Sequence, residues 1–320
     1  MIKVSIIIPI YHVEQYLTMC LDSVVSQTMT ENIECILVDD CGNDKSKEIA
    51  KSYVANYHGN IKFNIVERKQ NGGLSAARNS GIDAACGEYV YFLDSDDEIT
   101  PICMEKMWAQ VEKYGKVDLV QGAFFEDIEE ADTISDIEFL EYSNDKRQIK
   151  TFLLQYLGDI VGAQSRLIKL SFLKKNNLYF EEGIIHEDNL LTFFLAKYVK
   201  SMAYCNICTY FHRYNPNSIT KNVNVQKEYI SYKHIIRICC NNIDPYLPGT
   251  QKELILNNLI TVLNNQYYTN DNERKQIIDS FLYACSPCEK ILLQFYIKLS
   301  NSFIKNKFLH LLIRIFKVND

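Results

Sequence analysis

The feature that most constrains the fold is an alternation of strand-like and helix-like segments over the first hundred residues. Four apolar runs have the length of strands: "KVSIIIPI" (3–10), "IECILVDD" (33–40), "IKFNIVE" (61–67) and "EYVYFLDSDD" (88–97). Three segments with helical spacing separate them, at 14–27, 44–57 and 74–86. Continuous apolar strands joined by helices predict a mostly parallel, Rossmann-like α/β sheet with helices on both faces.

The rest of the chain follows this pattern less closely. Residues 124–147 are strongly acidic, and we expect a solvated insert there that carries no chemistry. Helical spacing returns at 151–180 and 183–199, a strand-like run covers 201–215, and residues 224–320 look helical throughout. We therefore expect a domain over 1–220, in the halves 1–100 and 101–220, followed by a helical C-terminal region over 221–320.

Composition limits the class of protein. A net charge of −6 gives no overall electrostatic reason to bind nucleic acid, and eleven cysteines without a framework spacing favour a reducing, cytoplasmic setting. Two C-x-x-C pairs, Cys205/Cys208 and Cys285/Cys288, lie too far apart for a compact zinc site, so we interpret them as core residues. No stretch of 18 uncharged apolar residues occurs, and we expect no membrane-spanning helix.

The predicted strands end in unusual residues. Pro9 to Tyr11 follow the first strand, Asp39-Asp40 the second and Asp94 to Asp97 the fourth. Because the carboxyl ends of parallel strands share one edge of a sheet, these residues should converge there, where such folds bind ligands. Carboxylates bind a diphosphate only through a divalent ion, so this edge predicts a nucleotide site with Mg²⁺ or Mn²⁺.

Other phosphate-binding signals are weak or missing. The chain has no G-x-G-x-x-G after its first strand and no G-x-x-x-x-G-K-[ST], which argues against dinucleotide oxidoreductases and P-loop NTPases. Gly72-Gly73, ahead of a helix, could serve an anion through free N–H groups or simply form a turn, and we favour the turn.

Several motifs together resemble a known family, the inverting family 2 glycosyltransferases of bacterial surface-polysaccharide type. They are "VSIIIPIYHVEQYLTMCLDSVVSQT", "ILVDDCGNDKS", "NGGLSAARNSGIDAACGEYVYFLDSDD" and "HEDNLLTFF". The resemblance implies a GT-A fold over 1–220, with a nucleotide-sugar half at 1–100 and an acceptor half at 101–220. It also implies transfer of a hexosyl or N-acetylhexosaminyl group from a nucleotide sugar, most plausibly a UDP-sugar, to a hydroxyl of a glycan or lipid-linked acceptor.

The resemblance also assigns the donor site. It places Pro9, Tyr11 and Asp39 around the base of the nucleotide, with Asp39 accepting from a uracil-type N–H and Tyr11 packing on the ring. Arg78 matches an arginine near the diphosphate, against the alternative of a structural salt bridge. These are the nucleotide contacts implied for the first half of the domain.

The D-x-D pattern of the family fits Asp94-Ser95-Asp96. It implies Asp94 toward the ribose and Asp96 on the metal, while some relatives use the adjacent pair Asp96-Asp97. In "YFHRYNPNSIT", the resemblance makes His212 a candidate metal ligand and Arg213 a candidate phosphate contact. Strand alternation puts these two side chains on opposite faces, and of the two we favour Arg213.

An inverting transfer also needs a general base, and the Glu-Asp motif of the family implies Asp188, with Glu187 orienting a loop or an acceptor group. The alternative for Asp188 is an N-cap of the helix that follows.

Two departures from the family affect the site. Cys41 stands where a glycine usually follows the Asp pair, and "VGAQSRLIKLSFL" lacks the usual aromatic residue, which leaves the acceptor pocket undefined.

Other questions remain open at this stage. Residues 290–319 contain six Lys or Arg and no acid, which fits a basic helix on the inner face of the plasma membrane or a terminal helix packed on the domain. The sequence leaves open whether the protein is a homodimer. The alternative functions are a sugar nucleotidyltransferase, whose glycine-rich basic loop is missing, and a non-catalytic nucleotide-sugar-binding module.

Overall fold

The computed structural model describes residues 1–125, 141–156, 162–216, 218, 224–244, 248–264, 271–285, 290, 293–294 and 297. The chain forms two compact units. Unit 1 contains Met1–Ile149, Gly162–Gly183 and Tyr198–Lys221, and unit 2 contains Lys150–Val161, Ile184–Lys197 and Asn222–Asp320. The division expected at residue 220 falls beside one of these boundaries, but two internal segments belong with the C-terminal helices.

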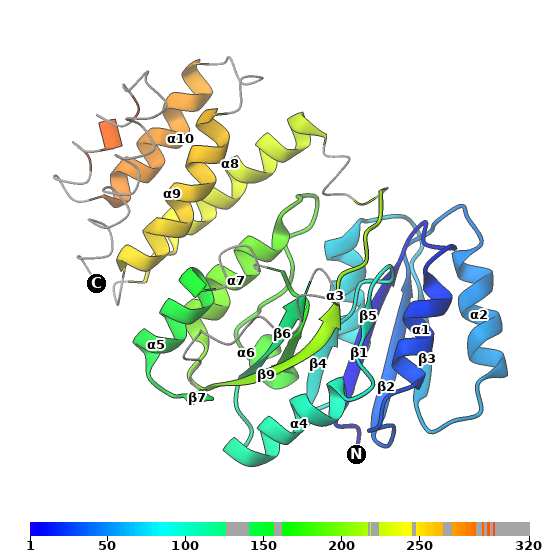
Figure 1. The fold of residues 1–320 in the computed structure, drawn as a ribbon. Coiled ribbons are helices and arrows are strands. Elements are labelled where there is room, and N and C mark those ends of the chain that lie inside the picture. Colours follow the sequence, from blue (N-terminus) through cyan, green and yellow to red (C-terminus); the bar gives the residue numbers. More distant parts are fainter. Residues whose placement is uncertain are drawn as a thin grey trace. The chain divides into compact units, whose positions relative to one another are not determined.

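A mixed sheet forms the centre of unit 1 (Figure 1). Within the described residues it has nine strands, eight of them in the order β3-β2-β1-β4-β8-β6-β9-β5, with β7 paired to β9. The strands are β1 (Val4–Ile10), β2 (Ile33–Asp39), β3 (Lys62–Glu67), β4 (Tyr89–Phe92), β5 (Glu98–Ile99), β6 (Leu119–Phe125), β7 (Tyr142–Ser143), β8 (Arg166–Lys169) and β9 (Met202–Phe211). Strands β3, β2, β1 and β4 are all parallel, as the alternation predicted.

Strand β8 corrects one prediction. The spacing over 151–180 predicted helix, yet residues 166–169 form a strand that lies antiparallel between β4 and β6. The remainder of that segment contains α5 (Lys146–Thr151), a π-helix (Phe152–Tyr156) and α6 (Leu170–Lys175) where it is described. A short apolar run buried on both sides has no distinct period, so spacing alone cannot separate strand from helix there.

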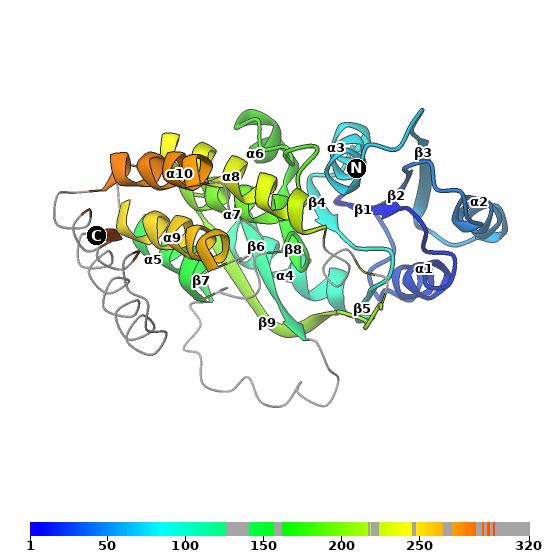
Figure 2. The ribbon, with the colours of Figure 1, turned by 90° about the horizontal axis from the view of Figure 1, so that it is seen from above.

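Helices cover both faces of the sheet (Figure 2). One face carries α1 (Leu17–Val25), α2 (Ser46–Asn56) and α4 (Cys103–Tyr114), whose apolar residues share a core with Ile6 and Ile8 of β1. The opposite face carries α3 (Leu74–Ala84). A Cβ at Gly81 of α3 would lie 2.3 Å from Cγ2 of Ile7, so glycine at this position allows the close packing of the helix on β1.

The regular elements described in unit 2 are all helices. Unit 2 contains α7 (Glu187–Tyr198), α8 (Val225–Asn241), α9 (Pro248–Asn264) and α10 (Asp271–Ala284), and α8, α9 and α10 pack on one another (Figure 1). The predicted helical C-terminal region is confirmed over these spans. No helix in the described part of the chain is both long enough and apolar enough to cross a bilayer. Of the basic segment 290–319, nearly all lies outside the described residues.

Candidate functional site

Three strands of unit 1 end at one edge of the sheet, as the sequence predicted. Ile10 of β1 pairs with Asp39 of β2, and the next N–H, that of Asp40, donates to the Ile10 carbonyl at 3.0 Å. On the other side of β1, the N–H of Leu93 donates to the Ile7 carbonyl, also at 3.0 Å, directly before the carboxylates. The segments after β1, β2 and β4 therefore form one rim.

Asp94 is held on both carboxylate oxygens. The guanidinium of Arg78 in α3 lies 2.8 Å from Oδ1, and Nε2 of Gln164 donates to Oδ2 at 2.5 Å. Burial opposes ionisation of Asp94, but the Arg78 charge and the Gln164 hydrogen bond outweigh it and lower the pKa of the carboxyl. Arg78 is fully buried, and its guanidinium lies over the Phe180 ring, 5.0 Å from the centroid.

Asp97 is buried and has three hydrogen-bond partners at the end of β9 and directly after it. Tyr210 donates through its hydroxyl to Oδ2 at 2.6 Å, and the backbone N–H of Arg213 donates to Oδ1 at 2.9 Å. Nδ1 of His212 lies 3.2 Å from Oδ2. This carboxylate therefore fixes the end of β9 in place, and both of its oxygens already have protein partners.

Asp96 lies between these two carboxylates and is half-buried. Nδ2 of Asn215 donates a hydrogen bond of 2.8 Å to Oδ2 of Asp96. Burial raises the pKa of Asp96, the negative charge of Asp94 raises it further, and the Asn215 hydrogen bond only partly offsets these effects. Asp96 is thus the carboxylate of the run that a cation would stabilise most.

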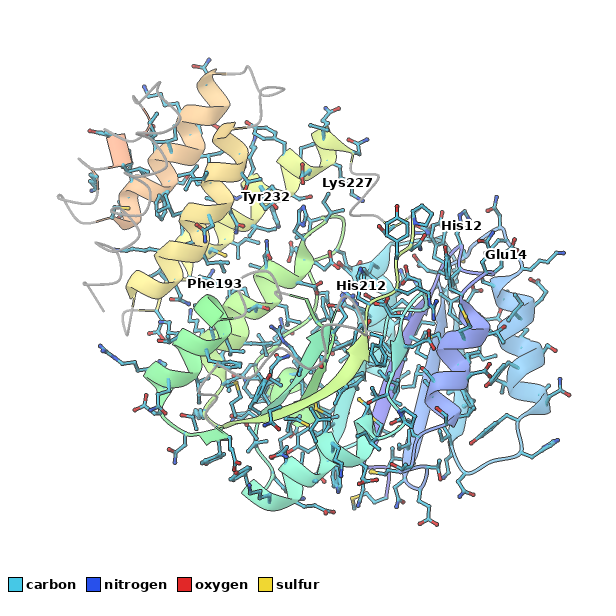
Figure 3. The ribbon with its side chains drawn as sticks, viewed as in Figure 1. His12, Glu14, Phe193, His212, Lys227 and Tyr232 are labelled. Atoms are coloured by element: carbon cyan, nitrogen blue, oxygen red, sulfur yellow. The ribbon has the colours of Figure 1, made fainter. Side chains whose placement is uncertain are left out.

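The structure separates His212 from Arg213. Figure 3 shows His212 just beyond the end of β9, and the Asp97 contact directs its ring toward the carboxylates. The guanidinium of Arg213 instead forms an ion pair with Glu98. Alternation predicted that the two side chains diverge, and the His212 ring contacts Asp97 whereas the Arg213 side chain pairs with Glu98. The backbone N–H of Arg213 also donates to Asp97, and the favoured contact of Arg213 with phosphate stays a prediction.

The residues at this rim fit a divalent ion bound jointly with a diphosphate. Asp96 offers a carboxylate oxygen, and a histidine whose Nδ1 is bonded to a carboxylate is well oriented to coordinate a metal through Nε2. The hydrogen bond to Asp97, working against burial, raises the pKa of His212 in the metal-free protein. Among the described residues, no three His, Cys, Asp or Glu side chains converge into a complete metal site, so phosphate oxygens and water would supply the other ligands.

The expected base-binding residues occupy the other end of the same rim. Asp39 is buried, and its Oδ2 lies 3.2 Å from Nζ of Lys47, which also binds Glu67. Tyr11 is 47% exposed and stacks on the next residue, His12, with ring centroids 4.1 Å apart. An exposed aromatic ring backed by a second ring offers a flat surface suited to a base. Pro9 is buried within β1 and contributes packing.

The structure fits the interpretation of Gly72-Gly73 as a turn, because a carboxylate of the protein itself binds their N–H groups. Asp40 accepts from the N–H groups of Gly72 and Gly73 at 3.0 and 2.8 Å, and Oδ1 of Asp40 lies 2.8 Å from Nε of Arg68. These N–H groups are therefore already occupied. Cys41, in the position of the family's glycine, adopts φ 59°, so the chain takes a left-handed conformation here without glycine.

The predicted general base, Asp188, lies in the first turn of α7 in unit 2. Asp188 is half-buried and its neighbour Glu187 is only 6% exposed. Acidic residues in a first helical turn are stabilised by the positive end of the helix dipole. The residue before them, His186, has a left-handed φ of 62°.

Sequence patterns missed the residues that hold the carboxylates. Gln164, Tyr210 and Asn215 each donate to one member of the run Asp94 to Asp97. Tyr210 carried a usable signal, because it lies two positions before His212 on an extended segment and so on the same face. Gln164 and Asn215 lie about 70 and 119 residues from their partners, and no local pattern connects them.

Comparison with known proteins identifies the family of the chain. Residues 5–176 match the model of "Glycosyl transferase family 2". Glycosyltransferase GlyA of Streptococcus pneumoniae serotype 4 is 29% identical over 68% of this chain, which spans only 32% of GlyA. The uncharacterized glycosyltransferase EpsJ of Bacillus subtilis is 30% identical over 80% of this chain and 77% of its own length.

Solved structures show the same fold. The S. aureus TarS 1-349 complex with UDP-GlcNAc superposes with a TM-score of 0.68 at 20% identity, covering 99% of this chain and 91% of TarS 1-349. Mannosyltransferase PcManGT from Pyrobaculum calidifontis, in complex with GDP-Man and Mn²⁺, gives a TM-score of 0.58 at 13% identity, covering 99% and 85%. The predicted α/β fold of GT-A type is confirmed. With the carboxylates at the end of β4 and a family model that matches more than half of its length, the chain belongs to glycosyltransferase family 2.

Proposed function

We propose that this protein transfers a sugar from a UDP-sugar, with inversion at the anomeric carbon, to a hydroxyl of a glycan or lipid-linked acceptor in surface-polymer synthesis. The observation that carries the proposal is that three neighbouring carboxylates differ in their protein partners and in the direction of their pKa shifts. Asp94 and Asp97 have protein donors on both oxygens, whereas Asp96 lies between them with a raised pKa. A cation bound at Asp96 would offset the repulsion between the Asp96 carboxylate and the neighbouring Asp94 carboxylate.

A divalent ion, Mg²⁺ or Mn²⁺, would neutralise charge that develops on the leaving diphosphate. Asp96 and His212 would hold it, and Asp97 orients the His212 ring rather than serving as a ligand. Asp94, kept ionised by Arg78 and Gln164, has the charge and geometry to accept from a ribose hydroxyl. Buried Arg78 acts on the donor through Asp94.

The base of the donor would pack on Tyr11, and Asp39 would accept from its ring N–H. Uracil is the base proposed, since TarS, which shares this fold, was solved with UDP-GlcNAc. The Lys47 contact positions the Asp39 carboxylate and lowers the cost of burying its charge. A matched test is Asp39→Asn, which keeps the size and loses one acceptor, and should weaken binding of UDP more than that of inorganic diphosphate.

Transfer itself would use Asp188 as general base. Its carboxylate takes the proton of the acceptor hydroxyl while the acceptor oxygen bonds to the anomeric carbon and the bond to the diphosphate oxygen breaks. The placement of Asp188 in the first turn of α7, half-buried, supports this role. The family match makes a glycosyltransferase the better reading than a sugar nucleotidyltransferase.

The proposal is tested with a panel of nucleotide sugars, by measuring UDP binding calorimetrically and UDP release with and without Mn²⁺. Asp96→Ala should lose the metal-dependent part of UDP binding, and Asp188→Asn should bind UDP normally and lose transfer. Normal turnover in Asp188→Asn would show that the base is another residue. Failure of every UDP-sugar would overturn the donor assignment.

A further inference from the structure

Residues on one face of α8 contact the turn that precedes α7, and both segments belong to unit 2. Nε2 of His186 lies 3.2 Å from Oε1 of Glu228, and the His186 ring stacks on Tyr232 with centroids 4.7 Å apart and planes 20° from parallel. One residue earlier, the N–H of Ile185 donates to Oγ of Ser231 at 3.0 Å. Figure 3 labels Tyr232 on this helix.

The three residues of α8 form a continuous contact surface. Glu228, Ser231 and Tyr232 are spaced i, i+3 and i+4, which places them on one side of a helix. Ser231 is buried, and its hydroxyl donates to the Lys227 carbonyl at 2.7 Å, so its oxygen is oriented to accept from Ile185. The contact combines a neutral hydrogen bond, an imidazole–carboxylate contact and a ring stack.

These contacts hold a backbone conformation that L-residues adopt only at a cost in free energy. His186 has a φ of 62°, and such a conformation persists only where its surroundings impose it. The His186 carbonyl accepts from the N–H of Asn189 at 3.1 Å, closing the turn around Glu187 and Asp188. The orientation of the His186 backbone therefore sets the direction in which Asp188 leaves the turn.

We propose that His186 is a positioning residue for glycosyl transfer and that α8 holds it through Glu228, Ser231 and Tyr232. The C-terminal region thereby contributes to the chemical step, by fixing the turn that carries the general base. This inference rests on the proposed role of Asp188. Without these contacts the turn can reorient and displace the base. A displacement of about 1 Å slows transfer by up to about 100-fold.

The variants come in matched pairs. Tyr232→Phe keeps the stack on His186, whereas Tyr232→Leu removes it. His186→Asn retains a residue that tolerates positive φ but loses both the ring and the Glu228 contact. Ile230→Ala, at a position of α8 that is 54% exposed, controls for a general disturbance of the helix.

Two measurements decide the matter. With the nucleotide sugar that gives the fastest Mn²⁺-dependent UDP release, Tyr232→Leu and His186→Asn should lower kcat about 10- to 100-fold with donor KM and UDP affinity within about twofold of the parent. Hydrogen exchange, which needs no substrate, should show faster exchange at the amides of Ile185 and Asn189 in these two variants. Tyr232→Phe and Ile230→Ala should match the parent in both.

Each failure has a separate meaning when Asp188→Asn is measured alongside. If Asp188→Asn loses transfer while Tyr232→Leu and His186→Asn keep the parent kcat, the positioning role is wrong and the base assignment stands. If Asp188→Asn transfers normally, the assignment of Asp188 as the general base in the proposed function is wrong. Unchanged exchange at Ile185 and Asn189 overturns the inference even where no donor is turned over.

Discussion

The different roles of Asp96 and Asp97 give the sharpest prediction. Asparagine at position 97 has one carboxylate oxygen replaced by an NH₂ group, in a site where Arg213 donates to one oxygen and Tyr210 and His212 contact the other. If the NH₂ faces Arg213, two donors meet and a buried N–H loses its partner. If it faces Tyr210 and His212, both must become acceptors.

Either arrangement has a measurable cost. Leaving a buried donor unsatisfied costs about 1–3 kcal/mol, so Asp97→Asn should lower the thermal midpoint by about 3–10 °C. In the second arrangement His212 carries its proton on Nε2, the nitrogen a metal would need, and loss of such a carboxylate partner typically weakens metal binding about 10- to 100-fold. Asp97→Asn should therefore lose both stability and Mn²⁺ affinity.

Asp96→Asn should also lose metal binding but, unlike Asp97→Asn, should keep its stability. The amide oxygen can still accept from Asn215, and removal of the charge relieves the repulsion that raises the Asp96 pKa, so the midpoint should stay the same or rise slightly. Mn²⁺-dependent UDP binding should disappear. Differential scanning fluorimetry and calorimetry with Mn²⁺ and UDP measure both quantities. If Asp97→Asn keeps its midpoint while Asp96→Asn loses stability, the roles assigned to the two carboxylates are reversed.

Three further predictions follow from the same rim. Gln164→Leu removes the 2.5 Å donor from Asp94 and should weaken UDP binding about 10-fold with little change in secondary structure by circular dichroism; full UDP affinity would show that Arg78 alone suffices. Asp40→Ala leaves the N–H groups of Gly72 and Gly73 without their acceptor and removes the carboxylate beside Nε of Arg68, whose Nη1 still donates to Ala76 and Ser80. It should cost about 1–3 kcal/mol in urea unfolding, and an unchanged free energy of unfolding would contradict the role of Asp40 as the acceptor in this turn. Because the hydrogen bond to Asp97 raises the pKa of His212 above 6.5, metal-free protein should gain stability below about pH 6.5 and lose it as pH rises through the folded pKa, and His212→Gln should abolish this component of the pH profile.

Local patterns were sufficient for the first half of the fold. Strands β1, β2 and β4 are almost fully buried, β3 lies at the partly exposed edge of the sheet, and helices join all four, an arrangement that repeats at short range along the chain. Because parallel strands end at one edge, the convergence of Tyr11, Asp39 and Asp94 could also be predicted. The β8 strand could not, since its pairing with β4 and β6 depends on partners distant in sequence.

The sequence by itself determined the parallel half of the sheet, the rim where ligands bind and the identities of the candidate residues, because periodicity and motif chemistry are local properties. Only the tertiary structure decided how the carboxylates differ, since Gln164, Tyr210 and Asn215 reach them from remote segments. It likewise connected His186 to α8 across about 40 residues. The partners of a charged group set its protonation and orientation, and folding brings those partners together from positions that no local pattern links.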